Sequence, residues 1–557
     1  MKQKPMYHFN NPVIMASPVK KRKRNPNFRI EFAGDDGQKR NVLESFQRIR
    51  SELSSKLDKP VGNLQVIETL FQLWSNKTKE SENELAEKEK PSVPSTYIKV
   101  QKKDVNQRIF LCAEESIKRL VEVAEHHGSS CKKHLKVKKI HQKGHVVTTH
   151  FFCDEQNDHS FLWSSSPYLP NKEYLVNNRV KHGFTCSGML PSHYVRFTEG
   201  AGIGKISKQS RQQFFNEMKE HIQREYDDST HTATLEEVAA YENEELGTIN
   251  IMSDARHGWR KNAKDTSVVA IGEKSHKVLS CQHVTKSDDV ISQRHEKLGT
   301  EKIYRHLKDQ EVNIGVHAHD RNLSINKFIR EECDSESQND TWHAVKSMKA
   351  ALKKISSGPA YLNGKTWSSQ LDDKVEPIST HFHWAIRNCD EDPEKLKSLL
   401  LNIVEHYKNN HQACHGSSRC KKDPNYEISR KVITDPRAEK LLLGVIKNSV
   451  IFKHPHDYRL CKDTFYVESF NNVVNIYQDK RISFSDAQYN ARTNLAVCHW
   501  NENVEREFTS IWKPNHRMPQ SVKGKKNYKK CTFIFRENIW KRYVKSAFRK
   551  RNRIHNR

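Results

Sequence analysis

Three β-rich segments between residues 247 and 286 constrain the fold of this chain most strongly. The stretch "GTINIMSDARH" is a short apolar run that delivers Asp254, and "DTSVVAIGEKSHKVLSCQHVTK" contains two alternating runs joined at residues 272–274. Such runs predict three strands that meander in one sheet. We therefore expect a sheet whose first strand carries an acidic side chain.

Two further acids lie in patterned segments downstream. In "VNIGVHAHDRNLSINKFIRE" the apolar residues of a predicted strand end at Asp320, and in "FYVESFNNVVNIYQDKRISF" Glu468 lies among apolar residues at near-helical spacing. RNase H-like nucleases and transposases have the same order of parts: a meander with an acid, a later strand that ends in an acid, and a distant glutamate on a helix. The expected fold class is α/β: an RNase H-like catalytic core, with a mixed sheet flanked by helices, a helical insertion and mainly helical N-terminal modules.

Three carboxylates in this order indicate a metal site. Mg²⁺ or Mn²⁺ prefers oxygen ligands, and Mg²⁺ keeps several waters, so one or two carboxylates per ion suffice. Two ions about 3.5–4 Å apart can activate a water or a 3′-hydroxyl and stabilise the leaving oxygen of a phosphodiester. We expect Asp254 to bridge the ions and Asp320 and Glu468 to complete the two sites. A single Asp at a strand end is more often a turn or cap residue, but three in this order favour the metal site.

The segments around these acids resemble the Kolobok-type cut-and-paste DNA transposases of animals and the proteins derived from them. The resemblance covers roughly residues 131–507 and rests on "SDARHGWRKNAK", "HDRNLSINKFIREE", "DTWHAVKSMKAALKKI", "ESFNNVVNIYQDKRISF" and "ARTNLAVCHWNENV". It implies that Asp254, Asp320 and Glu468 are the catalytic residues. It also places one further block beside them, comprising Asp340, Trp342, His343 and Lys346.

Several basic residues and a histidine near the acids are candidates to contact DNA phosphates or to position the metal ligands. Each could equally be a surface charge or a packed side chain. The candidates are Arg256, Arg321, His343, Lys346, Lys480 and Arg481.

The charge of the chain favours a polyanionic partner. Its 557 residues carry a formal net charge of +27, and DNA binding gains from the release of condensed counterions. Charge alone would also suit RNA or an acidic membrane. The expected partners are double-stranded DNA, as element ends and as target, and further copies of the chain on that DNA. We find no run of about eighteen apolar residues and no signal-peptide core, so a soluble, intracellular protein without a membrane partner is expected.

A compact basic cluster lies near the N-terminus. The run "PVKKRKR" stands in a polar leader, rich in Pro and Asn, that is not expected to fold. Such clusters act as nuclear-import signals or as nucleic-acid arms, and a solvated charge run is the alternative. We expect a nuclear protein whose import signal is Lys20, Lys21, Arg22, Lys23 and Arg24.

Composition and hydrophobic patterning divide the chain into several parts. The separation of Asp320 and Glu468 exceeds what an RNase H-like fold needs before its closing helix, which predicts a helical insertion. The predicted parts are a disordered basic leader (1–35), a small helical module (36–75), a linker (76–104), a small mixed, zinc-ribbon-like module (105–165), a helical helix-turn-helix or dimerisation region (166–245), the catalytic domain (246–510, with its insertion at about 350–460) and a basic tail (511–557).

Two groups of His and Cys have spacings that suit zinc, which takes four nitrogen and sulfur ligands in structural sites. Without a secretory context, the twelve cysteines are expected to be thiols or metal ligands. Exposed His and buried Cys are the alternative for both groups. The insertion offers His406, His411, Cys414 and Cys420, with His415 nearby, and the more loosely spaced group is Cys131, His134, Cys153 and His159.

Residues 188–222 predict a helix, a Gly-containing turn and a second helix, in helix-turn-helix order. The second helix carries Lys208, Arg211 and Gln212 and could enter a major groove. An ordinary helical hairpin or a dimerisation module fits the pattern equally well.

The C-terminal tail alternates basic residues with aromatics. A helix bearing Trp540, Tyr543 and Phe548 is expected to dock on the catalytic domain with its basic face toward phosphates, in preference to stacking on bases.

The leading hypothesis is a DNA transposase that cuts at element ends by metal-assisted hydrolysis and joins the freed 3′-hydroxyl to target DNA. The alternative is a domesticated, catalytically silent DNA-binding protein derived from a transposase, and the presence of all three acids favours activity. A third interpretation is an RNase H-like ribonuclease or Holliday-type nuclease. The long insertion and the helical N-terminal region disfavour it.

Overall fold

The computed structural model describes residues 47–48, 50–55, 107–131, 133–153, 159–241, 247–258, 263–357, 367–512 and 525–555. The chain divides into two units, Met1–Gln107 and Arg108–Arg557. In the first unit the described residues form a short helical stretch. The predicted leader with its basic cluster, and the predicted linker, lie outside the described residues. Among the described helices, none is both long and apolar enough to span a bilayer.

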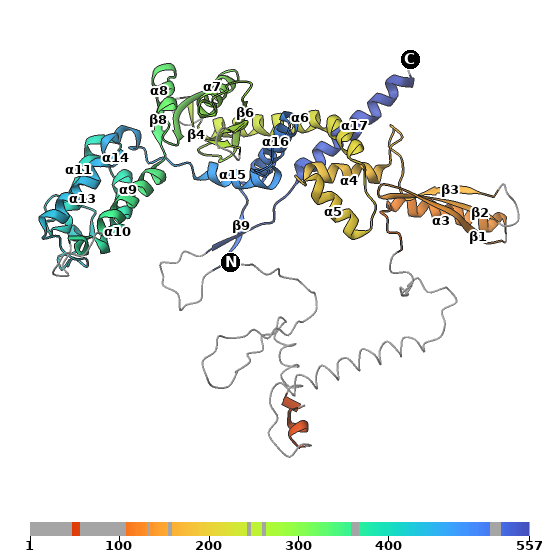
Figure 1. Cartoon of the computed structure of the whole chain (residues 1–557), viewed down its shortest axis with the longest axis horizontal. Helices are drawn as coiled ribbons and strands as arrows, with labels where there is room; N and C mark the ends of the chain where they lie inside the picture. The colour runs from red at the N-terminus through yellow and green to blue at the C-terminus, as the bar shows by residue number, and fades with distance from the viewer. Residues whose placement is uncertain are drawn as a thin grey trace. The chain divides into compact units, whose positions relative to one another are not determined.

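A five-stranded mixed sheet organises the second unit (Figure 1). Its strand order is β6-β5-β4-β7-β8, in which β5 is antiparallel to both neighbours and β7 is parallel to both of its neighbours. The three strands predicted between residues 247 and 286 are β4, β5 and β6, and the strand predicted before Asp320 is β7. The bounds are β4 (Thr248–His257), β5 (Asp265–Gly272), β6 (Val278–Thr285), β7 (Asn313–His319) and β8 (Glu336–Asn339).

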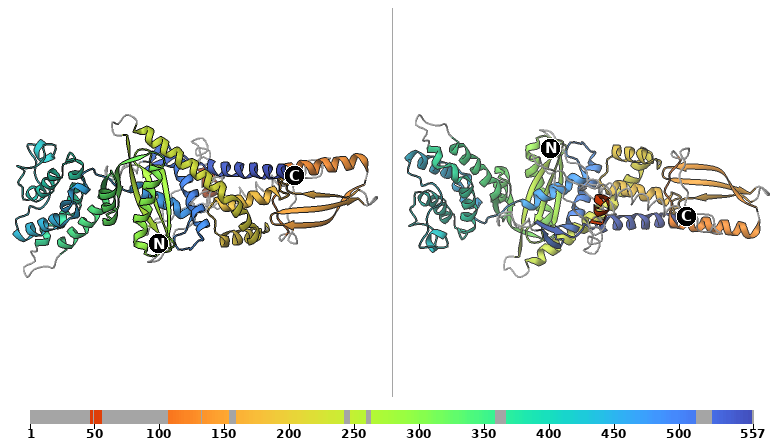
Figure 2. Two further views of the ribbon diagram at one scale, coloured as in Figure 1. Left: turned by 90° about the horizontal axis from the view of Figure 1, so that it is seen from above. Right: turned by 90° about the horizontal axis from the view of Figure 1, so that it is seen from below.

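Helices cover both faces of this sheet, and strand β5 is buried along its whole length. Val268 and Ala270 join a hydrophobic cluster with helix α7, whereas Val269 and Ile271 join a second cluster with α6, α15 and α16. The alternation follows from the two-residue period of a strand. Figure 2 shows the long helix α6 passing beside the sheet. The bounds are α6 (Lys208–Ala240), η2 (Ser292–Arg294), α7 (His295–Lys308), α8 (Leu323–Glu332), α15 (Phe465–Tyr477) and α16 (Asp486–Asn503).

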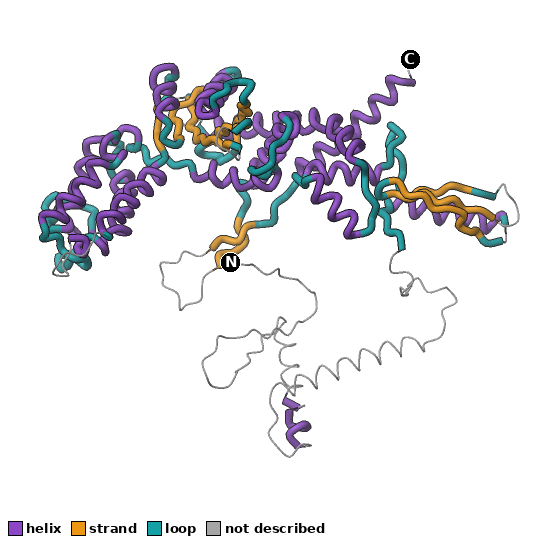
Figure 3. Tube along the Cα trace, in the orientation of Figure 1, coloured by secondary structure: helices purple, strands orange, loops and turns teal. Residues whose placement is uncertain are grey.

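The helices between β8 and α15, where an insertion is predicted, have a hydrophobic core of their own and are called the insertion below. Phe382, Leu400 and Leu442 are fully buried in that core. In its described residues the insertion consists of helices and loops (Figure 3). The bounds are α9 (Thr341–Ser356), η3 (Trp367–Gln370), η4 (Asp372–Lys374), α10 (Val375–Arg387), α11 (Pro393–Tyr407), α12 (Arg419–Lys422), α13 (Pro436–Asn448), α14 (Val450–Lys453) and η5 (Pro455–Asp457).

A smaller three-stranded antiparallel sheet of order β1-β2-β3 precedes the central sheet in the chain. Helix α3 packs on it: the Trp163 indole N–H of β3 donates to the Ser116 carbonyl at 2.7 Å. The module joins the rest of the unit through His145, whose Nε2 lies 2.7 Å from the Tyr194 hydroxyl of α5. The bounds are α3 (Glu114–Ser130), β1 (Leu135–Lys143), β2 (Val146–Cys153), β3 (Phe161–Ser164), α4 (Leu175–Cys186) and α5 (Pro191–Ala201).

Helices α5 and α6 follow each other in helix-turn-helix order, but α6 is a 33-residue helix that packs into the core. Arg211, one of the candidates for a groove contact, is buried, with its guanidinium 4.5 Å from the centre of the Tyr194 ring. Lys208 and Gln212 are exposed. The side chain of Arg211 therefore serves packing between α6 and α5 and does not face a DNA groove.

The C-terminal segment forms a β-hairpin, β9 (Phe508–Trp512) with β10 (Lys525–Tyr528), and helix α17 (Ile534–His555). Helix α17 packs on α6 and α16: Ile539 and Tyr543 are buried in the shared core, and the Asn538 amide donates to Glu225 of α6 at 2.9 Å. Phe548 stays exposed. The aromatic residues of this helix thus divide between packing on the core and exposure to solvent.

Gly299 of α7 provides a test of the packing between α7 and β5. A Cβ atom at this position would lie 2.3 Å from Cγ2 of Val268, which is fully buried. We expect Gly299→Ala to destabilise the fold by about 1–3 kcal/mol because a packed core cannot absorb an added methyl group without shifts. Thermal unfolding followed by circular dichroism measures this as a lower melting temperature.

The matched control is Gly444→Ala in helix α13, where the added Cβ meets nothing within 4 Å. That variant should melt at or slightly above the wild-type temperature, since Ala is the better helix former. Equal melting temperatures for the two variants would contradict this packing of α7 on β5.

Candidate active site

Asp254, Asp320 and Glu468 come from three segments of the chain and lie close enough to interact electrostatically, where β7 ends beside β4. Asp254 lies in β4, the central strand, and Asp320 follows the last residue of β7, whose His319 pairs with Ser253. Glu468 is in the first turn of α15. The Asn471 amide of α15 donates to Asp254 Oδ2 at 3.2 Å. Parallel pairing of β4 and β7 thus places two acids side by side, and α15 brings the third.

His343 of α9 connects two of these acids. Its Nδ1 lies 3.3 Å from Asp320 Oδ1, and its Nε2 lies 3.6 Å from Glu468 Oε1. The same Nδ1 is 3.4 Å from Asp340 Oδ1. Because His343 is only partly exposed and stands between two carboxylates, it bridges the end of β7 and the start of α15.

Hydrogen bonds to several parts of the fold hold Asp340 in place. It caps α9, accepting the His343 backbone N–H at 2.8 Å, and it accepts the backbone N–H and the hydroxyl of Thr464 at 2.8 and 2.6 Å. Its own N–H donates to the His319 carbonyl at 2.8 Å. Asp340 therefore joins β7, α9 and the start of α15, and its oxygens already have protein donors. Asp320 differs, because its Oδ1 is a buried atom without a hydrogen-bond partner.

The carboxylates repel one another. Burial, reinforced by the charges of Asp320 and Glu468, raises the pKa of Asp254 to about 6. Burial also raises the pKa of Asp320, against the effect of His343. A fourth acid, Glu296 at the start of α7, has its pKa raised to about 7 by burial and by Asp254 and Asp320, although Asn322 donates to it at 2.9 Å. A bound divalent cation would relieve this repulsion, so the donor set suits a hard metal ion.

Sequence patterns did not single out Glu296 or Asn471. Glu296 is one of several acids in a charged helical stretch, and only the close packing of α7 and α8 on the sheet brings it near Asp254. Asn471 lies three residues after Glu468, so the same helical turn that presents the glutamate also presents this amide.

The candidate basic residues fall into two kinds. Arg256 is buried and donates to Asn475 at 2.9 Å and to the side chain and carbonyl of Gln478 at 3.0 and 2.9 Å. It therefore fastens the end of α15 to β4 and does not present its guanidinium to DNA. The others are exposed: Arg321, Lys346, Lys480 and Arg481.

The insertion brings its four predicted ligands together. His406, His411, Cys414 and Cys420 each place one ligand atom within 4.8 Å of the others. The Cys414 sulfur lies 3.5 Å from His406 Nδ1 and 3.7 Å from His411 Nδ1. Burial lowers the pKa of His406 to about 4, which keeps its imidazole neutral, as a metal ligand requires.

The structure brings together only part of the second predicted group of metal ligands. Cys131, Cys153 and His159 converge, but the fourth member of the cluster is His127, whereas His134 is exposed and lies outside it. The His134 prediction failed because Cys131 ends helix α3 and the chain then turns into β1. One helical turn before Cys131, His127 shares its face of the helix.

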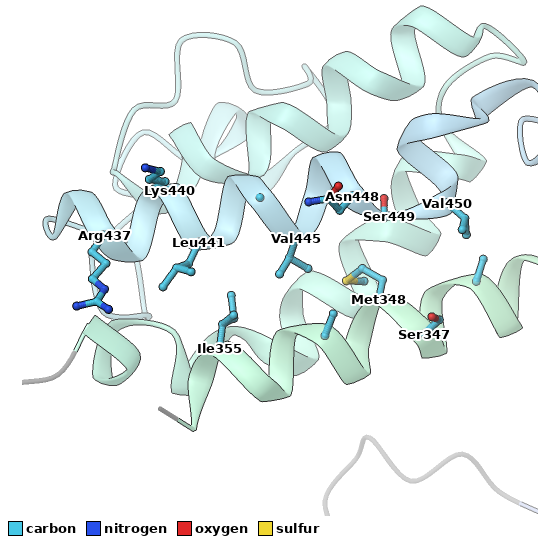
Figure 4. A pocket seen from close by; sticks show the side chains of 13 residues that line it. Ser347, Met348, Ile355, Arg437, Lys440, Leu441, Val445, Asn448, Ser449 and Val450 are labelled. Atoms are coloured by element: carbon cyan, nitrogen blue, oxygen red, sulfur yellow. The ribbon is translucent and has the colours of Figure 1, made fainter. Parts of the chain in front are cut away.

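A groove of about 660 Å³ lies between α9 and α13 of the insertion (Figure 4). Met348, Ile355, Leu441 and Val445 line it with apolar side chains, and Lys440 stands at its edge. It contains none of the acids described above and offers no metal ligands. We therefore do not expect the catalytic site of the chain to lie in this groove.

Comparison with known protein families finds a match to part of the chain. The Mutator-like transposase family model matches residues 288–420. No curated protein matches the chain. The matched range contains Asp320 and His343, but neither Asp254 nor Glu468. This match relates the chain to transposases and indicates a transposase-related function.

Removing the charge of Asp254 should stabilise the metal-free protein. The folded state holds a proton on Asp254 more tightly than the unfolded chain does, because burial raises its pKa to about 6. Protonated Asp254 therefore stabilises the folded state at low pH, and this stabilisation is lost as pH rises toward 6. In EDTA at pH 8, Asp254→Asn should raise the melting temperature by about 3–6 °C.

The melting temperatures of wild type and variant should be compared across pH. Their difference should shrink as pH falls from 6 to 4, where wild-type Asp254 is protonated and resembles an amide. Asp463→Asn, at an exposed acid outside the site, should leave the melting temperature unchanged. A difference for Asp254→Asn that stays constant from pH 8 to pH 4 would contradict the raised pKa.

Proposed function

We propose that this chain is a DDE-type DNA transposase of the Kolobok kind, acting as nuclease and strand transferase. The observation that carries the proposal is the convergence of Asp254, Asp320 and Glu468, with His343 within 3.3 Å of one acid and 3.6 Å of another. The match of residues 288–420 to Mutator-like transposases supports a transposase, and the sequence blocks around the acids support the Kolobok kind.

The catalytic core is proposed to be RNase H-like. Three antiparallel strands in the order β6-β5-β4, extended by the parallel strands β7 and β8, support this assignment. So do the positions of the acids, on the central strand, at the end of its parallel neighbour and on a helix that packs against the sheet. The helical insertion between β8 and α15 is then an addition to that core.

Two divalent cations, Mg²⁺ or Mn²⁺, are the proposed cofactors. Asp254 would bridge them, with Asp320 and Glu468 as the remaining ligands. Bound in this way, the ions would supply Lewis acidity to an attacking water or 3′-hydroxyl and to the leaving oxygen. Oδ1 of Asp320 accepts no hydrogen bond, and the pKa of Asp254 is raised; both observations fit such a donor set.

The chain's own groups hold this arrangement. Asn471 orients Asp254, and His343 sets the spacing between Asp320 and Glu468.

Hydrolysis breaks a P–O bond at the element end and leaves a 3′-hydroxyl. In strand transfer that oxygen forms a new bond to a target phosphorus, and the target's own 3′-oxygen leaves, so the number of phosphodiester bonds is conserved. Exposed Lys346, Lys480 and Arg481 are proposed to contact phosphates.

The proposed partner is double-stranded DNA, as element ends and as target, bound by several copies of the chain. The net charge of +27 supports a polyanionic partner. Nuclear localisation is proposed from the basic run at residues 20–24, which lies outside the described residues.

The alternative proposal is a domesticated DNA-binding protein without catalytic activity. Against it stands the geometry of the acids: a protein without metal chemistry gains nothing from carboxylates that repel one another. A ribonuclease or Holliday-type nuclease would use the same acids on another substrate.

Glu468→Gln should leave the chain folded and DNA-bound but reduce strand cleavage by more than about a hundredfold, because the amide removes a negative ligand while keeping the side-chain volume. The measurement is nicking of DNA carrying the element's ends, in magnesium or manganese at low salt, with binding measured in parallel. Affinity should persist because it arises mainly from Lys and Arg contacts to phosphates.

Asp463→Asn is the matched control and should cleave like wild type, because Asp463 is exposed and an amide oxygen can also accept the Phe465 backbone N–H that its carboxylate accepts. If Glu468→Gln cleaves as well as wild type, the assignment of the acids is wrong. If wild type binds these DNAs without cutting them, the silent DNA-binding protein is the better account. Preferred cutting of RNA–DNA hybrids or four-way junctions would favour the third interpretation.

A structural zinc ion is proposed for the cluster of His406, His411, Cys414 and Cys420. Surrounding groups already orient the ligands: Asn409 lies 3.1 Å from His411 Nε2, so the ring presents Nδ1 to the cluster, and Asn402 donates to the Cys414 sulfur at 3.3 Å. Such outer contacts are typical of metal ligands.

Replacing Cys414 and Cys420 together by Ser should lower the zinc content of the purified chain by about one ion, because two of four ligands are lost. Elemental analysis measures this. His415→Ala is the control, since His415 is next to Cys414 in the chain but lies outside the cluster. Unchanged zinc content in the Cys414→Ser, Cys420→Ser variant would remove these residues as ligands.

A further inference from the structure

A second cluster of metal-ligating side chains lies at the far end of the small sheet from the Trp163–Ser116 contact. His127 is in the last turn of α3, Cys131 directly follows that helix, Cys153 ends β2 and His159 precedes β3. One ligand atom from each lies within 4.8 Å of all the others. We propose that these four residues bind a structural zinc ion, with His127 as the ligand that sequence spacing does not identify.

The distance between the two sulfurs fits tetrahedral coordination. Cys131 Sγ and Cys153 Sγ are 3.7 Å apart. A tetrahedron whose Zn–S arms are about 2.3 Å long has an edge of about 3.8 Å. A disulfide would need the sulfurs about 2.05 Å apart. The two cysteines therefore stand at the separation of two thiolates that share a metal ion.

The two histidines present unused nitrogen atoms to the cluster. His127 Nε2 and His159 Nδ1 are both buried and have no hydrogen-bond partner. The rings lie edge to face, with centroids 5.6 Å apart and planes at 89°, so they do not stack. A buried polar atom without a partner destabilises the folded state, because it has lost its hydrogen bonds to water. Bonds from these lone pairs to a metal ion would remove that cost at both nitrogens together.

The small sheet has little hydrophobic core to hold α3 without such a bond. Among the residues of α3 only Ser116 is fully buried, while Ile117 and Val121 are about half exposed at 54% and 50%. Strand β1 is exposed at seven of its nine positions. The indole of Trp163 holds the first turn of α3, and the cluster stands at its last turn. Zinc at that point fixes the second end of the helix, as metals do in domains too small to bury a sufficient core.

The test measures zinc in the purified full-length chain, in which Cys414→Ser and Cys420→Ser have removed the insertion cluster. About one zinc per chain should remain, and either His127→Ala or Cys153→Ser should remove it. His134→Ala is the matched control and should keep the zinc, because His134 is exposed and outside the cluster. Should the parent variant not fold, the same substitutions in the unaltered chain should each lower the zinc content by about one ion.

His127→Cys separates ligation from folding. A thiolate can replace an imidazole in a four-ligand zinc site, so this variant should retain zinc where His127→Ala loses it. The Co²⁺-loaded parent should show the absorption of tetrahedral cobalt, and a thiolate-to-metal band that strengthens in His127→Cys.

Three results would overturn the proposal. One is a parent variant, folded and purified with zinc available, that contains none. Another is zinc loss in His134→Ala with retention in His127→Ala. The last is a mass lower by two hydrogens with Cys131 and Cys153 unreactive to thiol reagents, which would show a disulfide. None of these results bears on the carboxylate site, so this proposal and the proposed transposase activity fail independently.

Discussion

Electrostatic repulsion among partly buried carboxylates is the constraint on which the rest of the second unit depends. Asp254, Asp320 and Glu296 each have a pKa above the ordinary range, because burial and neighbouring acids disfavour their ionised forms. Such a group of acids does not assemble by itself. It is held by strand pairing between β4 and β7, by the guanidinium of Arg256 between β4 and α15, and by packing of helices on both faces of the sheet. Because the fold holds these acids together despite their repulsion, a bound divalent cation would stabilise the site by offsetting their negative charge.

The same contacts explain how a long insertion can interrupt the core without disturbing the acids. The chain leaves the sheet at Asp340 and returns at Thr464, and the two residues are joined by hydrogen bonds of 2.6 and 2.8 Å. The backbone N–H of Thr341 also donates to the Lys462 carbonyl at 3.1 Å. The insertion is thus closed at its base and has its own hydrophobic core. His343, in the first turn of α9, is therefore fixed relative to Asp320 and Glu468 by the same junction.

The sequence predicts a large part of this arrangement, and the failures have physical causes. Strands β4 to β7 were predictable because buried β-branched runs have few other stable arrangements. The insertion ligands were predictable because His406, His411, Cys414 and Cys420 are close in sequence. His127 was missed because its partners Cys153 and His159 reach it only through β-sheet pairing. The roles of Arg256 and Arg211 stayed open between DNA contact and packing, because a formal charge does not reveal that a side chain is buried.

The central claim is that Asp254, Asp320 and Glu468 form one divalent-metal site. Crystals of the full-length chain with Mn²⁺, and a cleaved end of DNA if needed, test it through the anomalous scattering of manganese. The account predicts anomalous peaks between the carboxylates of these three residues, with one ion bound through Oδ1 of Asp320, which accepts no hydrogen bond. It also predicts that Glu468→Gln loses one of these peaks. Well-ordered carboxylates at saturating Mn²⁺ with no peak between them, or a peak that is unchanged in Glu468→Gln, would contradict it.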